Sequence, residues 1–303
     1  MWPRVAVIIL NWNGLQDTLD CLGSLGSVDY PEYDVLVVDN GSGDGSPAAI
    51  RAGYPDVALW ENPRNLGFTG GNNVGIRRAL ERGADYVLLL NNDTCVAPNF
   101  LRELVAAAEA DPEIGAAGPT IYYHVAPDVI WSAGGIVDWR QGDIRMRGTD
   151  EKDAGQFGSA PQEVDFITGC AMLLKRAALE RVGGLDERFF AYYEESEWCL
   201  RARRAGWRVV HVPAARIWHK IDPDRRSASA LVHYYMTRNR LLFLRLAGAG
   251  LRAWGHTLLV EYLRTLISWS VKPRWRHKGP QRRAMVQAIT DFYRGRFNQM
   301  EGM

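Results

Sequence analysis

The stretch Tyr86-Val87-Leu88-Leu89-Leu90-Asn91-Asn92-Asp93-Thr94 decides the fold class of this 303-residue chain. A short apolar run bounded by polar residues is typical of a strand buried in a parallel sheet. Ligands of open α/β sheets bind just beyond the carboxyl ends of such strands. Asp93 is therefore expected at the mouth of a site, where its carboxylate can offer oxygen to a hard divalent ion. The alternative is that Asn92, Asp93 and Thr94 form only a turn that caps the next helix.

Two earlier apolar runs have the same design. Residues 5–10 lead into Asn11-Trp12-Asn13-Gly14, and residues 34–38 lead into Asp39 and a glycine-rich turn. Helical spacing between the runs predicts an α/β fold with a parallel sheet wound with helices. Because a parallel sheet aligns its strand ends on one edge, a ligand with a base, sugar hydroxyls and phosphates would meet all three loops. The side chains expected there are Asn11, Asn13, Asp39 and Asp93.

The rest of the first 228 residues continues this alternation. A loop rich in Gly and Asn spans residues 62–73, and a helix is expected over 74–82. Further strands are expected over 115–123, 165–174 and 209–213, the last at a sheet edge. The charged stretch 138–163 favours a solvated hairpin or loop.

A second concentration of chemistry lies at Glu194-Glu195-Ser196-Glu197. Carboxylates this close raise one another's pKa, which makes a general base competent near neutral pH. The alternative is an acidic helix N-terminus that stabilises the helix dipole, with Glu197 paired to Arg201 four residues later. We favour the ion-pair interpretation for Glu197 and the general-base interpretation for Glu195. His219 follows this block and could complete a metal site, or serve only the core.

Composition excludes several classes of protein. The net charge of +1 gives no global nucleic-acid signature. The four cysteines lack CxxC spacing, which suits buried thiols in a reducing compartment. The N-terminus does not have the pattern of a signal peptide, and Glu261 and Arg264 interrupt the longest apolar run. These features predict a cytoplasmic protein, in contact with the inner face of the cell membrane at most.

The pattern changes after residue 228. Long helices follow, and Lys and Arg crowd the tail between aromatic residues. Such helices suit an anionic membrane surface, or else packing on the core or on a second subunit as a homodimer. The sequence predicts two parts: an α/β domain of residues 1–228 and a helical region of residues 229–303. The α/β domain is expected to have a nucleotide-sugar half (1–95) and an acceptor half (96–228).

Taken together, an ordered set of motifs resembles the family-two inverting glycosyltransferases of GT-A fold, especially the bacterial branch that includes rhamnosyltransferases. The set covers residues 4 to about 245. The matching segments are residues 7–13, 37–42, 65–73, 90–94, 183–201 and 234–239.

This resemblance implies a nucleotide-diphospho-sugar donor, such as a dTDP- or UDP-sugar, and a divalent cation, Mg²⁺ or Mn²⁺. It places the donor against Asn11, Asn13, Asp39, Asn65, Gly67, Asn72, Asn92 and Asp93, the metal on Asp93 and His219, and the catalytic base on Glu195 or Glu194. Asn91 stands where the family's DxD motif has its first acid, so metal binding rests on fewer charges. The Glu-Asp motif reads Glu194-Glu195 here.

The resemblance also implies the reaction. The base removes a proton from an acceptor hydroxyl, the oxygen attacks the anomeric carbon, and the nucleoside diphosphate leaves from the opposite face. Rhamnose is the expected sugar, and the acceptor is a polysaccharide or lipid-linked glycan. A catalytically silent sugar-nucleotide-binding or scaffolding protein of the same fold is the alternative. Two other functions do not fit the sequence. A nucleotidyltransferase would have a basic, Gly-rich loop after the first strand, and a NAD-binding protein would have a GxGxxG motif there; this chain has neither.

Overall fold

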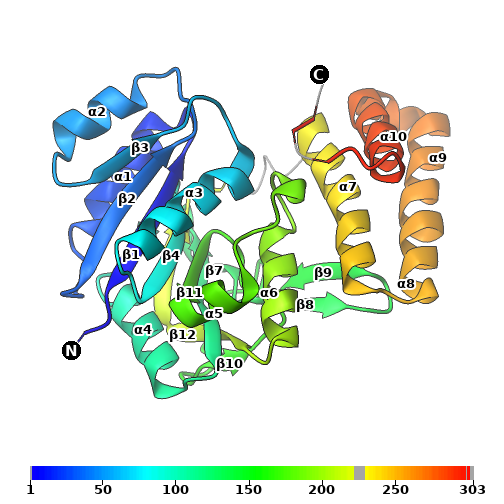
Figure 1. Cartoon of the computed structure of the whole chain (residues 1–303). Coiled ribbons are helices and arrows are strands. Elements are labelled where there is room, and N and C mark those ends of the chain that lie inside the picture. Colours follow the sequence, from blue (N-terminus) through cyan, green and yellow to red (C-terminus); the bar gives the residue numbers. More distant parts are fainter. Residues whose placement is uncertain (1, 222–228, 298, 301–303) are drawn as a thin grey trace.

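The computed structural model describes residues 2–221, 229–297 and 299–300 (Figure 1). Within them, a ten-stranded sheet has the order β10-β12-β6-β11-β4-β1-β2-β3, with β5 paired to β12 and β7 to β6. The strands are β1 (Val5–Asn11), β2 (Tyr33–Asp39), β3 (Ala58–Glu61), β4 (Tyr86–Asn91), β5 (Thr94–Val96), β6 (Ile114–Tyr123), β7 (Ala126–Ser132), β10 (Gln162–Glu163), β11 (Ala171–Lys175) and β12 (Arg208–His219).

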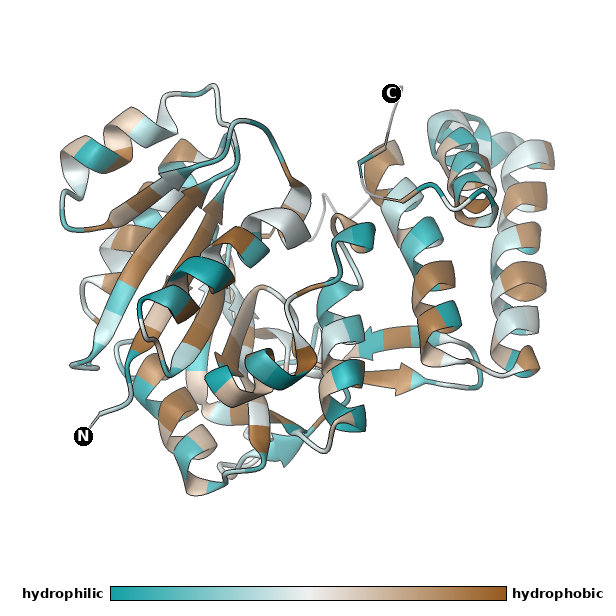
Figure 2. Cartoon of the chain, viewed as in Figure 1, coloured by the Kyte–Doolittle hydropathy of each residue, from teal (hydrophilic) through white to brown (hydrophobic). Residues whose placement is uncertain are grey.

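Helices cover both faces of this sheet because the central strands are apolar on both sides. In β1, Val5, Val7 and Ile9 face one layer of helices, while Ala6 and Ile8 face the other. The first layer holds α1 (Leu15–Leu25), α2 (Ser46–Gly53) and α4 (Phe100–Ala110); the second holds α3 (Gly67–Glu81), α5 (Arg176–Val182) and α6 (Glu194–Arg204). Figure 2 shows the hydrophobic strands between the two layers.

The register of the parallel strands brings their polar ends together. Asn11 lies opposite Asp39 on β2, and Leu10 lies opposite Asn91 on β4. The predicted alignment of the three strand ends on one edge of an α/β sheet is therefore confirmed.

Two predicted strands differ from those observed. The strand expected over 165–174 begins only at Ala171, because the backbones of Asp165 and Phe166 are hydrogen-bonded to Gly135 instead. The strand expected at an edge over 209–213 is the long, mostly buried β12, which lies between β10 and β6. Pro213 falls in an irregularity of the β12–β6 pairing between Val212 and Arg216, which explains the apparent end of the strand there.

Helix α3 begins seven residues earlier than the expected start at residue 74, at Gly67. Its glycines allow the helix to lie directly on β1. A Cβ on Gly71 would lie 2.3 Å from a methyl carbon of Leu10, and one on Gly75 would lie 2.4 Å from a methyl carbon of Ile8. The Gly-Asn stretch that reads as a loop is therefore helical because close packing outweighs weak helix propensity.

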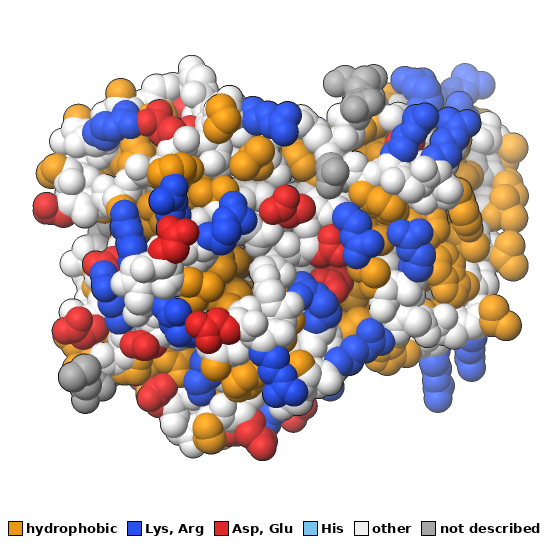
Figure 3. Space-filling model, in the orientation of Figure 1, with side chains coloured by type: hydrophobic (Ala, Val, Ile, Leu, Met, Phe, Trp, Pro, Cys, Tyr) orange, Lys and Arg blue, Asp and Glu red, His pale blue; other side chains and the backbone are white. Residues whose placement is uncertain are grey.

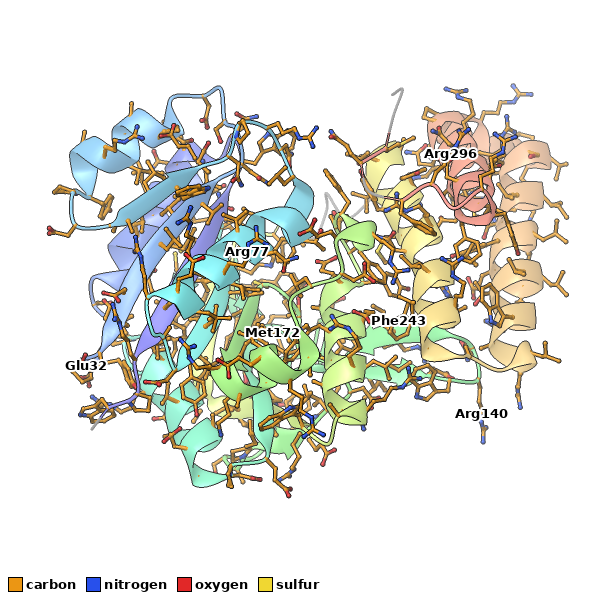
Figure 4. The ribbon with its side chains drawn as sticks, in the orientation of Figure 1. Glu32, Arg77, Arg140, Met172, Phe243 and Arg296 are labelled. Atoms are coloured by element: carbon orange, nitrogen blue, oxygen red, sulfur yellow. The ribbon has the colours of Figure 1, made fainter. Side chains whose placement is uncertain are left out.

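The charged stretch contains a hairpin of β8 (Gly135–Asp138) and β9 (Asp143–Met146), which reaches toward the C-terminal helices (Figure 1). There Phe243, labelled in Figure 4, stacks on Trp139 with ring centroids 6.0 Å apart. This contact ties the hairpin to the helical region.

The helical region packs as a third layer beside α6 (Figure 1). It contains α7 (Ala230–Ala247), a continuous helical run of α8 (Leu251–Gly255), the π-helix η3 (His256–Leu263) and α9 (Arg264–Val271), then the 3₁₀ helix η4 (Pro273–Lys278) and α10 (Gly279–Tyr293). No helix in the described part of the chain has the length and apolar character needed to cross a membrane. The predicted boundary at residue 228 lies outside the described residues.

Candidate functional site

Asn11 is the centre of a hydrogen-bond network that joins the three strand ends. Its Nδ2 donates to Asp39 Oδ2 at 2.7 Å and to Ser42 Oγ at 3.1 Å. Its Oδ1 accepts from the hydroxyl of Thr18 at 2.9 Å and, more weakly, from Nδ2 of Asn92 at 3.4 Å. Because Asn11 is fully buried and its amide is occupied within the protein, it positions the loops around the site.

The loop after β2 is held in the same way. The second carboxylate oxygen of Asp39 accepts from the backbone N–H groups of Gly41 and Ser42. Ser42 Oγ also accepts from the backbone of Asn13, whose own Oδ1 accepts from Gly43 at 2.8 Å. The loops after β1 and β2 thus form one preorganised unit, with Asn13 at its exposed rim.

Asn40 connects this unit to the loop before α3. Its Nδ2 donates to Asn65 Oδ1 and to the carbonyl of Gly67, both at 3.0 Å. Its Oδ1 accepts from Asn62 Nδ2 at 3.0 Å. Asn65 Oδ1 accepts in turn from the backbone of Gly67 at 2.7 Å. Asn65 and Gly67 therefore lie beside the Asp39 loop as expected for one binding edge.

Asn72 lies in a different setting from the other predicted donor residues. It is buried on α3, and its Nδ2 donates to the carbonyl of Phe68 one turn earlier at 2.9 Å. Its neighbour Asn73 holds Leu185 through two backbone hydrogen bonds of 2.8 Å each. Both amides therefore have partners inside the fold.

Asp93 and His219 meet at the end of β4. Asp93 Oδ1 lies 3.1 Å from Nε2 of His219, which β12 brings opposite Thr94. Burial raises the pKa of Asp93, but the contact with His219 outweighs it and the pKa lies below its ordinary value. Burial lowers the pKa of His219, whereas Cys170 and Asp93 beside it raise it to about 10. The pair is thus strongly coupled by charge.

This pair fits part of a metal site. Asp93 Oδ1 is shielded from solvent and makes no well-aligned hydrogen bond within the described structure, and Nε2 of His219 faces it at 3.1 Å. Carboxylate oxygen and imidazole nitrogen are suitable ligands for Mn²⁺. No group of three or more His, Cys, Asp or Glu side chains among the described residues could hold a metal.

The acidic block opens helix α6, and its three carboxylates have different environments. Glu197 is bound by Nε of Arg201 at 2.8 Å, as expected from their spacing. Glu194 is buried, so burial and the charge of Glu195 raise its pKa well above the ordinary value. Glu195 is partly exposed, and burial of its carboxyl raises its pKa to about 7. Of the three residues, Glu195 is the one that is partly exposed, and its carboxyl has a pKa raised to about 7.

Two carboxylate oxygens of this block have no hydrogen-bond partner in the described structure. Oε2 of Glu194 and Oε2 of Glu195 have no hydrogen-bond partner in the part of the chain that the structure describes, although both atoms are shielded from solvent. A Cβ built on Gly169 would lie 3.9 Å from Cβ of Glu195, and the carbonyl of the next residue, Cys170, accepts from Asn91 N at 2.8 Å. The turn before β11 therefore links the acidic block to the end of β4.

The loop before α6 has an unusual backbone. Phe190, Tyr192 and Tyr193 all have positive φ, at 64°, 71° and 74°. Such conformations are costly for residues other than glycine and persist only where the surroundings enforce them. They are found mainly at functional sites.

Helix α7 enforces this backbone. Nδ2 of Asn239 lies 2.9, 2.7 and 2.9 Å from the carbonyl oxygens of Phe189, Ala191 and Tyr192. The guanidinium of the preceding Arg238 donates to the carbonyls of Arg188 and Phe189 at 3.1 and 2.9 Å. One fully buried pair of residues thus satisfies most carbonyls of the loop.

The same loop touches the donor side of the site. The carbonyl of Phe190 accepts from the backbone of Thr69 at 3.1 Å. Gly67 has φ +76°, and a Cβ there would lie 2.5 Å from that carbonyl oxygen. Only glycine fits this close approach. The loop before the acidic block and the first turn of α3 are therefore in direct contact.

The structure brings most predicted residues to this edge. Asn11, Asn13, Asp39 and Asn92 form one network, Asn65 and Gly67 adjoin it, and Asp93 pairs with His219. Sequence reasoning gave no role to the residues that hold the site together, although all lie inside the quoted motifs; these are Asn40, Ser42, Arg238 and Asn239.

Comparison with known proteins gives a consistent family. A family model described as glycosyltransferase like family 2 matches residues 3–240. An N-acetylglucosaminyl-diphospho-decaprenol L-rhamnosyltransferase of Mycobacterium tuberculosis is 33% identical over 223 residues, which cover 65% of this chain and 70% of the relative. A dTDP-rhamnosyl transferase, RfbF, of Shigella flexneri is 25% identical over 197 residues, or 60% and 61% of the two chains.

A solved structure shares the fold. The mannosyltransferase PcManGT from Pyrobaculum calidifontis, in complex with GDP-Man and Mn²⁺, superposes with a TM-score of 0.59 at 18% identity. The match covers 97% of this chain and 88% of that one.

Proposed function

The chain belongs to glycosyltransferase family 2, in its rhamnosyltransferase-like branch, and from this premise we propose that it is an inverting transferase of a sugar from a nucleotide-diphospho-sugar to a hydroxyl group. The observation that carries the proposal is the partly exposed Glu195, whose carboxyl has a pKa raised to about 7. A general base is most effective when its pKa lies near the working pH.

The residues of the site then have distinct tasks. The Glu195 carboxylate accepts the proton of the acceptor hydroxyl as its oxygen bonds to the anomeric carbon. The bond from that carbon to the diphosphate oxygen breaks on the opposite face, so the configuration inverts. Burial and the charge of Glu195 raise the pKa of Glu194 well above its ordinary value, which favours its protonated form and limits charge repulsion beside the base. Asn13, Asn65, Gly67 and Asn92 form the proposed donor side, Asn11 and Asp39 position its loops, and the buried Asn72 acts through the packing of α3.

Asp93 and His219 are the proposed protein ligands of a divalent cation. When bound there, the ion would supply positive charge that stabilises the leaving diphosphate. The two facing ligand atoms, 3.1 Å apart, support this assignment.

We propose a rhamnose donor and a glycan acceptor. The relative that matches with 33% identity is named as a rhamnosyltransferase acting on N-acetylglucosaminyl-diphospho-decaprenol. By that likeness, the acceptor of this chain is a lipid-linked glycan. We also retain the division into residues 1–95, 96–228 and 229–303 as part of the proposal.

A donor screen tests this function. Thermal unfolding would be followed with Mn²⁺ and dTDP-rhamnose, UDP-N-acetylglucosamine or GDP-mannose. A donor at 100 times its Kd stabilises a protein by about 2.7 kcal/mol. We expect dTDP-rhamnose to give the largest rise in Tm, and NMR of the transferred sugar to show the anomeric configuration opposite to that of the donor. Retained configuration, or no response to any of the three sugar nucleotides, would overturn the proposal.

Replacing His219 by Ala should raise the Mn²⁺ requirement. We expect the Mn²⁺ concentration for half-maximal transfer to increase at least about tenfold, because one of two protein ligands is lost. Electron paramagnetic resonance of free Mn²⁺, titrated with enzyme and dTDP, gives the same comparison without turnover. His124→Ala removes an exposed imidazole and serves as the control. Equal Mn²⁺ binding by the His219 variant and the control would show that His219 is not a ligand.

A further inference from the structure

The last helices of the chain present an apolar stripe to solvent. Leu259, Leu263, Ile267 and Val271 are 63%, 47%, 52% and 68% exposed. Their spacing of four residues along η3 and α9 places them on one face of a continuous helical run. Figure 3 shows hydrophobic side chains along the outer face of α9, with Lys and Arg above and below them. Contiguous exposed apolar surface of this kind marks an interaction site.

Basic side chains border this stripe. Arg264 on α9 is exposed between the apolar positions. A hollow between α9 and α10 is lined by Leu266, Ser270, Arg282, Arg283, Val286 and Gln287. Within it, Arg282 donates to the hydroxyl of Ser270 at 3.3 Å. Both helices therefore carry apolar and cationic groups.

The charge of this region sets it apart from the rest of the chain. Residues 251–303 contain ten Lys and Arg against three Asp and Glu, in a chain that has 36 and 35 overall. One of those acids, Asp291, is buried and accepts from the hydroxyl of Tyr234 at 2.9 Å. The helical region is thus strongly cationic, while the preceding part of the chain is net acidic.

We propose that this face, formed by η3, α9 and α10, binds the surface of an anionic lipid bilayer. Apolar side chains flanked by Lys and Arg are the combination that enters the interface of acidic membranes. A second copy of the chain is a poorer occupant, because a symmetric contact would place two cationic faces against each other.

The position of this face suits the proposed reaction, on which this inference rests. Helix α7 packs against α10 on one side and, through Asn239, holds the loop before Glu194 and Glu195 on the other. A bilayer seated on α9 and α10 is then separated from the acidic block by packed helices only. Membrane binding would hold the site close to the surface where a lipid-linked acceptor resides.

Vesicle flotation with the full chain tests the proposal without donor or acceptor, so its outcome is independent of catalysis. We expect the protein to float with vesicles of phosphatidylcholine and phosphatidylglycerol, and not with phosphatidylcholine alone. High salt should weaken the binding. The double variant Leu263→Glu/Ile267→Glu should bind at least about tenfold more weakly. Val125→Glu/Ile136→Glu, at exposed apolar positions outside the helical region, should bind like the unaltered protein.

A second variant covers the case in which the first fails to fold. Arg264→Gln/Arg283→Gln leaves the apolar stripe intact and should weaken binding about fivefold per residue removed. Thermal unfolding checks that each variant is folded. Four results would each overturn the proposal. The first two are equal flotation with neutral vesicles and no flotation at all. The others are unchanged binding by the arginine variant and a dimer in light scattering that Leu263→Glu/Ile267→Glu abolishes.

Discussion

Replacing Glu195 by Gln should lower kcat for sugar transfer by about 10² to 10⁴-fold. The amide has nearly the shape of the carboxylate but cannot accept the proton of the acceptor hydroxyl. Glu195 makes no ion pair in the described structure, so the substitution should leave the fold and the Kd for the donor unchanged. Transfer assays at saturating donor, with calorimetry for donor binding, measure the two effects separately.

The pH dependence provides a second readout of the same variant. The pKa of Glu195 is raised to about 7, and only the deprotonated form accepts a proton, so kcat/KM of the unaltered enzyme should fall as the pH drops below about 7. This acid limb should be absent from the residual activity of the variant. Glu194→Gln is the matched control and should lose less activity, because the raised pKa of the buried Glu194 favours its protonated form, whose shape the amide matches. The assignment is wrong if Glu194→Gln is the more damaging change.

Replacing Asn239 by Ala should reduce kcat by about 10²-fold, although Asn239 lies on α7 in the C-terminal helical region. Without its amide, three backbone carbonyls lose their shared donor and the positive-φ loop loses its support. A displacement of a catalytic group by about 1 Å is enough to cost 10²-fold in rate. The base should shift while the donor network around Asn11 stays intact, so kcat should fall with little change in the Kd for donor.

Thermal unfolding and the pH profile separate positioning from general destabilisation. The acid limb near pH 7 should move in Asn239→Ala, because the surroundings of Glu195 change. Met236→Ala, which shortens an exposed side chain on the same helix, is the control and should keep both kcat and the limb. A lowered Tm with kcat and pH profile unchanged would mean that Asn239 supports the fold alone.

The central strands and their aligned ends could be predicted because they depend on local pattern. An apolar run that ends in a polar residue specifies both a buried strand and its carboxyl end, which is why Asn11, Asp39 and Asp93 were predicted together. The start of α3 was not predictable in this way. Gly71 and Gly75 favour a loop by propensity, and only their contact with β1 makes them helical.

The support of the acidic block could not be derived from local pattern either. Asn239 lies 47 to 50 residues from the carbonyls it binds, and no periodicity links the two segments. The motif at residues 234–239 indicated that this segment matters, but only the packed structure shows which atoms it holds. Asp93 and His219 were predicted as metal ligands through family resemblance, and their geometry depends on β12 lying beside β5.

The position of β11 also has a consequence during synthesis. Strand β11 lies between β4 and β6, although both precede it in the chain. The ribosome must therefore add the residues from 92 to 171 after β4 is complete, which takes roughly 4 to 16 s at typical rates of translation. Throughout that interval the N–H and C=O groups along one edge of β4 lack their partners on β11, and unpaired edges attract other strands. Complete pairing of the sheet during vectorial folding therefore has to wait for the synthesis of β11.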